Sequence, residues 1–109
     1  MGCMKNLSGR WSLSSIPRNW KVDVLELNSG NDGKVTGKAN ILIDDSPLSF
    51  RVFGNYNGAS VDINFISELT RSYTEIQFNF VGNCKGDNVF DGAIFGEELT
   101  GSCQMTHLA

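Results

Sequence analysis

Residues 75–84 read EIQFNFVGNC and decide the fold class. Apolar side chains at positions 76, 78, 80 and 84 alternate with polar ones at 75, 77, 79 and 83. A period of two puts neighbouring side chains on opposite faces of a β-strand, so this segment is expected to have one dry and one wet face. The same alternation runs through residues 48–56 and 61–65, and no window has a convincing helical period. The sequence therefore predicts an all-β chain.

Turn-forming residues separate these segments at short intervals, at 28–33 (NSGNDG), 44–47 (DDSP), 57–58 (NG), 85–88 (KGDN) and 96–98 (GEE). Asn57-Gly58 is a hairpin signal, because both residues tolerate positive φ. We expect eight strands, over residues 7–15, 20–28, 34–43, 47–56, 60–67, 73–84, 88–95 and 99–107. Eight short strands with hairpin-length links predict an eight-stranded antiparallel up-and-down β-barrel.

Glycines inside the predicted strands favour closure of this sheet. They are Gly9, Gly37, Gly54, Gly82, Gly92 and Gly101. All but Gly92 are assigned to the apolar face. Glycine weakens a strand, but an inward glycine lets the strand coil sharply without side-chain collisions. A flat two-sheet sandwich would need fewer of them, and closure also removes exposed sheet edges.

Length and composition exclude several functional classes. The 109 residues fit one domain, which we place at 7–109 behind an N-terminal tail at 1–6. A net charge of −3 argues against a nucleic-acid partner. The apolar runs are far shorter than the roughly 20 residues of a transmembrane segment. One histidine cannot build a two-histidine metal site, and we expect neither a metal nor another cofactor. No hydrophobic leader opens the chain, which favours a cytoplasmic location, and a mature form whose leader has been removed is the alternative.

Residues 7–11, LSGRW, resemble the first strand of the calycins. Avidins carry Leu-Ser/Thr-Gly-x-Trp there, and lipocalins carry Gly-x-Trp. Residues 35–38 (VTGK) and 90–92 (FDG) resemble other strands of such barrels. The resemblance implies that Trp11 closes one end of the barrel. It does not extend to biotin, because Leu13 and Ala39 stand where avidins have a polar ligand contact and a tyrosine.

The predicted interior contains no Asp, Glu, Lys or Arg. Its members are Leu7, Trp11, Leu13, Val22, Val24, Val35, Ala39, Ile41, Leu48, Phe50, Val52, Tyr56, Val61, Ile63, Phe65, Ile76, Phe78, Phe80, Cys84, Phe90, Ile94, Cys103 and Met105. Catalysis needs placed acids, bases or nucleophiles, so we expect no catalytic residues and no enzyme activity inside the barrel.

Two interpretations of this interior stay open. Side chains alone can fill a barrel of eight strands. Alternatively, a small apolar pocket holds an apolar small molecule, with Tyr56 as its polar group. Its lining would be Phe50, Phe65, Phe78, Phe80 and Phe90.

The alternative function is a protein-interaction module. Some bacterial protease inhibitors use a compact lipocalin-like barrel. The expected contact surface is the outer wall or a loop. Its outward candidates are Trp20, Arg51, Phe53 and Phe95.

The N-terminus MGCMKN resembles a dual-acylation signal, with myristate on Gly2 and palmitate on Cys3, which would tether the protein to a membrane. Asn6 departs from the Ser or Thr that this signal prefers. An artificial extension before a natural start at Met4, or a processed lipoprotein cysteine, would explain the same residues.

The remaining cysteines leave two readings. Cys84 and Cys103 are expected as two small buried hydrophobic residues, and a bridge between them stays open.

Three further motifs are interpreted structurally. Residues 28–33 resemble a calcium loop, but Ala39 stands where the bidentate Glu belongs, which favours a plain turn. Asp44-Asp45 is expected to be a solvated turn, and His107 a residue at the barrel mouth. Residues 6–8 fit a glycosylation pattern but lie where the first strand begins.

Overall fold

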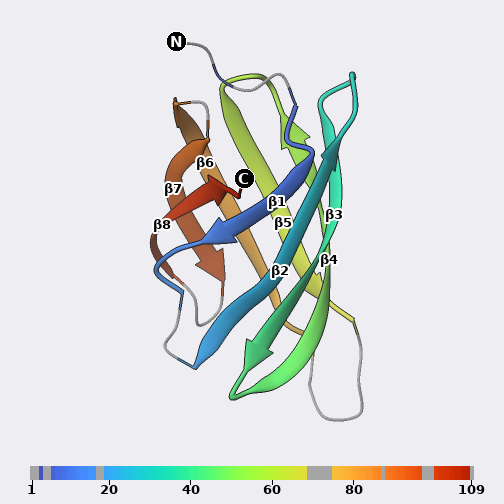
Figure 1. The fold of residues 1–109 in the computed structure, drawn as a ribbon, viewed down its shortest axis with the longest axis vertical. Coiled ribbons are helices and arrows are strands. Elements are labelled where there is room, and N and C mark those ends of the chain that lie inside the picture. Colours follow the sequence, from blue (N-terminus) through green and yellow to red (C-terminus); the bar gives the residue numbers. More distant parts are fainter. Residues whose placement is uncertain are drawn as a thin grey trace.

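Eight antiparallel strands form one closed barrel in the computed structural model (Figure 1). The structure describes residues 3, 6–16, 19–68, 75–86, 88–96 and 100–108. The strands are β1 (Gly9–Leu13), β2 (Trp20–Ser29), β3 (Lys34–Ile43), β4 (Ser46–Tyr56), β5 (Ser60–Ser67), β6 (Gln77–Gly86), β7 (Val89–Gly96) and β8 (Thr100–His107). Each pairs with the next, and β8 pairs with β1. This confirms the predicted eight-stranded up-and-down barrel.

The barrel has two ends, which are named here after their tryptophans. The Trp11 end carries the start of β1, the turns at 30–33 and 57–59, and the end of β8. The Trp20 end carries the end of β1, the start of β2 and the turn at Asp44 and Asp45. In Figure 1 the Trp11 end is at the top and the Trp20 end at the bottom.

A β-bulge in β2 changes which side chains face inward. The register between β2 and β3 shifts between Val22 and Val24, so the alternation of β2 moves by one residue there. The prediction of an inward Val24 is therefore wrong: it lies opposite Asn40, and Leu25 and Leu27 are buried in its place. Val22 is half-buried against the core.

The same shift corrects the predicted outward position of Trp20. Before the bulge, Trp20 points to the same side of β2 as Val22, and it packs against the core as a half-buried residue.

Outside β2 the predicted interior is confirmed. Ile76 and Cys84 are half-buried, and the other predicted members are buried.

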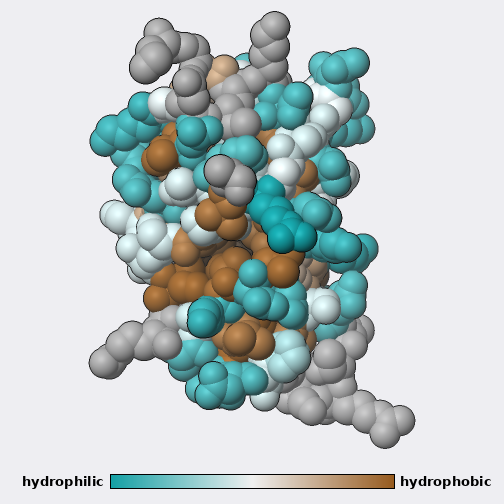
Figure 2. All heavy atoms as spheres, in the orientation of Figure 1, coloured by the Kyte–Doolittle hydropathy of each residue, from teal (hydrophilic) through white to brown (hydrophobic). Residues whose placement is uncertain are grey.

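Strand β1 is shorter than predicted, and this leaves part of the barrel wall unpaired. β1 meets β2 at Gly9 and Arg10 and meets β8 from Trp11 to Leu13. The first halves of β2 (20–25) and β8 (100–104) therefore have no registered partner in β1. Ser14 continues the contact, since its N–H donates to the Gln104 carbonyl oxygen over 3.0 Å. Figure 2 shows hydrophobic side chains gathered in the lower half of this face, beneath β1.

The inward glycines follow the prediction with two changes. Gly92 lies directly opposite Gly82 and so belongs to the inward register as well. Gly101 lies opposite Ile94 on the inward register, yet it is exposed, because β1 does not extend over the start of β8.

Within the part of the chain that is described, no helix is long and apolar enough to cross a membrane.

Candidate functional site

The six residues predicted to line a pocket are all buried, but they do not form one group. Phe50, Phe65 and Phe78 gather with Trp20 at one end of the barrel. Tyr56 and Phe90 gather with Trp11 at the other. The Phe80 ring leans toward Gly82, where an added Cβ would lie 2.8 Å from its Cζ.

The Trp20 cluster, defined as Trp20, Phe50, Phe65 and Phe78, joins rings from four strands. The Trp20 ring lies 6.5 Å from that of Phe50 and 6.0 Å from that of Phe78, between ring centroids. The Phe65 and Phe78 rings stack at 4.4 Å with an interplanar angle of 9°. Such pairs add to the stability that burial of their area alone supplies. Trp20 is the half-buried member, and the three phenylalanines are buried.

Two stretches of unpaired strand lie at the Trp20 end. The unpaired half of β2 begins at Trp20, and the unpaired half of β8 contains Gly101. A Cβ built on Gly101 meets no described heavy atom within 4 Å. The start of β8 is thus exposed at the same end as the Trp20 cluster.

The polar groups near this end are internally satisfied. Ser67, opposite Phe50 in the register, is the one buried polar residue in the described part of the core. Its hydroxyl oxygen accepts the Ile76 N–H over 2.8 Å, and its own N–H donates to the Ile76 carbonyl oxygen over 2.9 Å. In the described ranges, no buried side-chain nitrogen or oxygen lacks a hydrogen-bond partner. This arrangement can hold an apolar group, and it offers no placed acid or base.

The Trp11 cluster, defined as Trp11, Tyr56, Phe90 and His107, is more closed. Trp11 is 1 % exposed, and its indole N–H donates to the Leu7 carbonyl oxygen over 2.8 Å. Its ring lies 5.7 Å from Phe90 and 4.9 Å from the half-buried His107. Tyr56 packs edge-on against Phe90, and burial raises the pKa of its hydroxyl. His107 therefore sits at the barrel mouth, as predicted.

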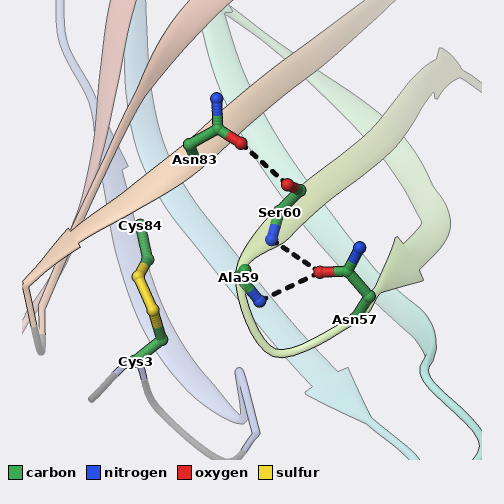
Figure 3. Close-up of a disulfide and its surroundings, with 6 residues drawn as sticks. All are labelled: Cys3, Asn57, Ala59, Ser60, Asn83 and Cys84. Atoms are coloured by element: carbon green, nitrogen blue, oxygen red, sulfur yellow. Dashed lines mark hydrogen bonds between the residues drawn. A yellow bond between two sulfur atoms is a disulfide. The ribbon is translucent and has the colours of Figure 1, made fainter.

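A disulfide joins the N-terminal segment to the barrel at this end (Figure 3). Cys3 pairs with Cys84 of β6, with their Cα atoms 6.0 Å apart, a common separation for disulfides. The Cys84 N–H donates to the Ala59 carbonyl oxygen over 2.8 Å, which places the bridge beside the turn between β4 and β5. Cys3 is thus fixed to the end that Trp11 occupies.

This pairing replaces the alternative bridge between Cys84 and Cys103. Cys103 is buried and free, as predicted for it, whereas Cys84 is bonded and half-buried. Burial raises the pKa of the Cys103 thiol, which keeps it protonated and unreactive. The Cys3 sulfur in this bridge cannot carry palmitate, and Gly2 lies outside the described residues.

The acidic turns are structural. Asp44 and Asp45 both have positive φ (52° and 65°) and form the two-residue turn between β3 and β4, exposed to solvent. In the loop at 28–33, an Asp32 carboxylate oxygen accepts the Lys34 N–H over 3.1 Å. A search of the described positions found no group of three or more His, Cys, Asp or Glu that could hold a metal ion.

The site that sequence reasoning missed is Trp20 itself. Its parity with Val22 was visible in the sequence and is the signal that could have placed it inside. Comparison with known proteins adds no further assignment: no protein-family model, curated protein or solved structure matches this chain.

Proposed function

We propose that this protein is a non-enzymatic binding barrel that takes a small, flat, apolar molecule at the Trp20 end. The ligand would lie between the Trp20 cluster and the inner face of β8. The observation that carries the proposal is the half-buried Trp20 ring, which packs on buried phenylalanines beside a part of the wall that β1 leaves unpaired. Small-molecule sites are mostly apolar, and the side chains that gather at this end are apolar rings.

The two ends differ in what covers their rings. At the Trp11 end, Trp11, Tyr56 and Phe90 are buried, and the disulfide fixes Cys3 nearby. At the Trp20 end the largest ring is half-buried and the adjoining wall is unpaired. A ligand entering here would replace water at Trp20 without disturbing a sealed core.

The uncharged surroundings support binding over catalysis. Among the described residues no Asp, Glu, Lys or Arg is buried, so no ionised side chain is available inside to attack a ligand or to transfer a proton. A ligand of about ten non-hydrogen atoms, at about 0.5 kcal/mol per atom, would bind with about 5 kcal/mol. This corresponds to a Kd of roughly 0.2 mM.

The test is a titration with the uncharged, apolar fluorescent dye N-phenyl-1-naphthylamine, followed by energy transfer from tryptophan to the dye. We expect saturable binding that Gly101→Leu weakens at least tenfold, because the leucine side chain would fill the space beside Gly101 that the proposal gives to the ligand. Trp20→Ala should remove most of the energy transfer and weaken binding at least fivefold.

Gly101→Ala is the matched control and should bind within twofold of the parent, since one methyl group leaves most of the space open. Trp11→Phe should keep the energy transfer. If Gly101→Leu folds normally, judged by its circular dichroism, and binds as well as Gly101→Ala, the ligand does not occupy this space and the proposal is rejected.

A further inference from the structure

A second feature lies on the outer wall, on strands β3 and β4, which run side by side (Figure 1). Phe53 is 43 % exposed at the middle of β4, with its side chain on the outer face. Three exposed cations, Lys34, Lys38 and Arg51, surround it on the same face. These four residues are called the basic face below.

The register fixes their spacing. Phe53 lies opposite Thr36, while Lys38 lies opposite Arg51 and Lys34 opposite Asn55. At about 3.4 Å of rise per residue, Lys34 and Lys38 are roughly 14 Å apart along the strand. Phe53 therefore sits midway between a single cation at one end and a pair of cations at the other.

Lys38 and Arg51 repel each other across β3 and β4, and this repulsion does not stabilise the fold. Of all registered strand pairs between described residues, this is the one that sets two like charges directly opposite each other, which is unfavourable. Glu26 lies on the other side of Lys38, but it is also opposite Arg10. Arg51 has Ile66 as its other neighbour. The described residues contain one ion pair within 4.0 Å, between Lys85 and Asp91, and none at the basic face.

Phe95 shows that an exposed phenylalanine alone does not produce this arrangement. It is 50 % exposed on β7 and lies opposite Asn79 and Thr100. The outward residues next to these, Gln77, Val81, Ala93 and Ser102, carry no charge. Phe53 and Phe95 are therefore a matched pair of exposed rings, one with cations around it and one without.

We propose that the basic face binds an extended, acidic peptide segment of a partner protein, with the pattern acidic–x–apolar–x–acidic. An extended peptide laid along β3 and β4 has the same rise per residue as the strands. Its two acidic side chains would be about 14 Å apart, matching Lys34 at one end and Lys38 with Arg51 at the other. The apolar side chain between them would cover Phe53. Arginine adds geometric specificity, because its guanidinium can bind a carboxylate through two hydrogen bonds.

A peptide fits better than the other polyanions. Nucleic acid carries a negative charge at every nucleotide, so a protein with net charge −3 repels it more strongly than a short segment with two carboxylates. A membrane surface would receive one apolar anchor from the middle of a strand, which is little for insertion. The proposal stands on the outer wall and is independent of ligand binding inside the barrel.

The test is a titration of ¹⁵N-labelled protein with the peptide acetyl-Gly-Glu-Ser-Phe-Ser-Glu-Gly-amide, followed by NMR. We expect amide shifts confined to residues 34–38 and 51–55 and their immediate strand neighbours. Binding should weaken at least fivefold when both glutamates are replaced by glutamine, and at least fivefold between 50 and 500 mM salt, since exposed charges are screened.

Variants of the protein locate the contact. Arg51→Gln and Phe53→Ser should each weaken binding at least fivefold, while Phe95→Ser, the matched control, should leave it within twofold. A twelve-residue oligothymidylate and vesicles with 30 % phosphatidylserine are the competing probes. The proposal is overturned if the peptide gives no shifts at 5 mM, if the shifts lie elsewhere, or if either competing probe binds the basic face more tightly than the peptide.

Discussion

Gly92→Ala is expected to lower the free energy of unfolding by about 3 kcal/mol or more, the upper range for forced overpacking in a core. A Cβ at this position would overlap the Val81 carbonyl oxygen and would lie 2.5 Å from the Gly82 Cα atom. Both obstacles are backbone atoms of β6, so no side-chain rotation can relieve them. β6 and β7 would have to separate where Gly82 and Gly92 face each other.

The measurement is urea unfolding followed by circular dichroism, with Gly101→Ala as the matched control. Both glycines lie in strands on the inward register, but a Cβ at Gly101 meets no described atom within 4 Å. We expect the control to stay within about 0.5 kcal/mol of the parent, as is usual for a substitution that removes no packing. Equal effects of the two substitutions would contradict the close approach of β6 and β7.

Trp11→Ala is the second substitution with a large expected effect, a loss of about 3–5 kcal/mol, as for other buried aromatic residues. It removes the ring that contacts Phe90 and His107. It also removes the N–H donor to the Leu7 carbonyl oxygen, and a buried acceptor left without its partner adds to the cost.

Trp20→Ala is the comparison for Trp11→Ala in guanidinium unfolding. Trp20 is half-buried and gives up less contact, so we expect a loss of about 1–2 kcal/mol, from partial burial of an aromatic side chain. If Trp20→Ala is as destabilising as Trp11→Ala, the two ends of the barrel are equally closed. The difference between the ends on which the proposed ligand site depends would then be absent.

The barrel itself could be predicted because its signals are local. Alternating residues in segments such as 75–84 show strands, and Asn57-Gly58 marks a hairpin whose glycine has a φ of 91°. Hairpin-length links leave few ways to arrange eight such strands. The turn at Asp44 and Asp45 follows the same logic.

The errors came from features that depend on tertiary context. The stretch Val22-Asp-Val-Leu-Glu-Leu27 has apolar residues on both parities, and only pairing with β3 shows where the bulge switches between them. The bridge between Cys3 and Cys84 joins residues 81 positions apart, and no local pattern encodes it. The end of β1 at Leu13 depends on where β8 and β2 diverge.

The six residues predicted to line the pocket are all buried, but they do not lie at one place in the barrel, and the prediction left out Trp20. Phe50, Phe65 and Phe78 do lie together, since β4, β5 and β6 are neighbours in an up-and-down barrel. Tyr56 belongs to the opposite end, because eleven residues of β4 span the length of the barrel from the Trp20 end to the Trp11 end. The alternation of side chains shows which residues face inward, but it does not show how far along the barrel axis each of them lies.

The most direct test of ligand binding at the Trp20 end is the position of a bound apolar probe. Isotope-edited NMR with toluene as the probe would measure nuclear Overhauser effects between toluene protons and the side chains of the labelled protein. The predicted contacts are with the rings of Trp20, Phe50 and Phe78 and with the Gly101 α-protons. Contacts with Phe95 or Phe53 alone, or none at toluene saturation, would contradict a binding site inside this barrel.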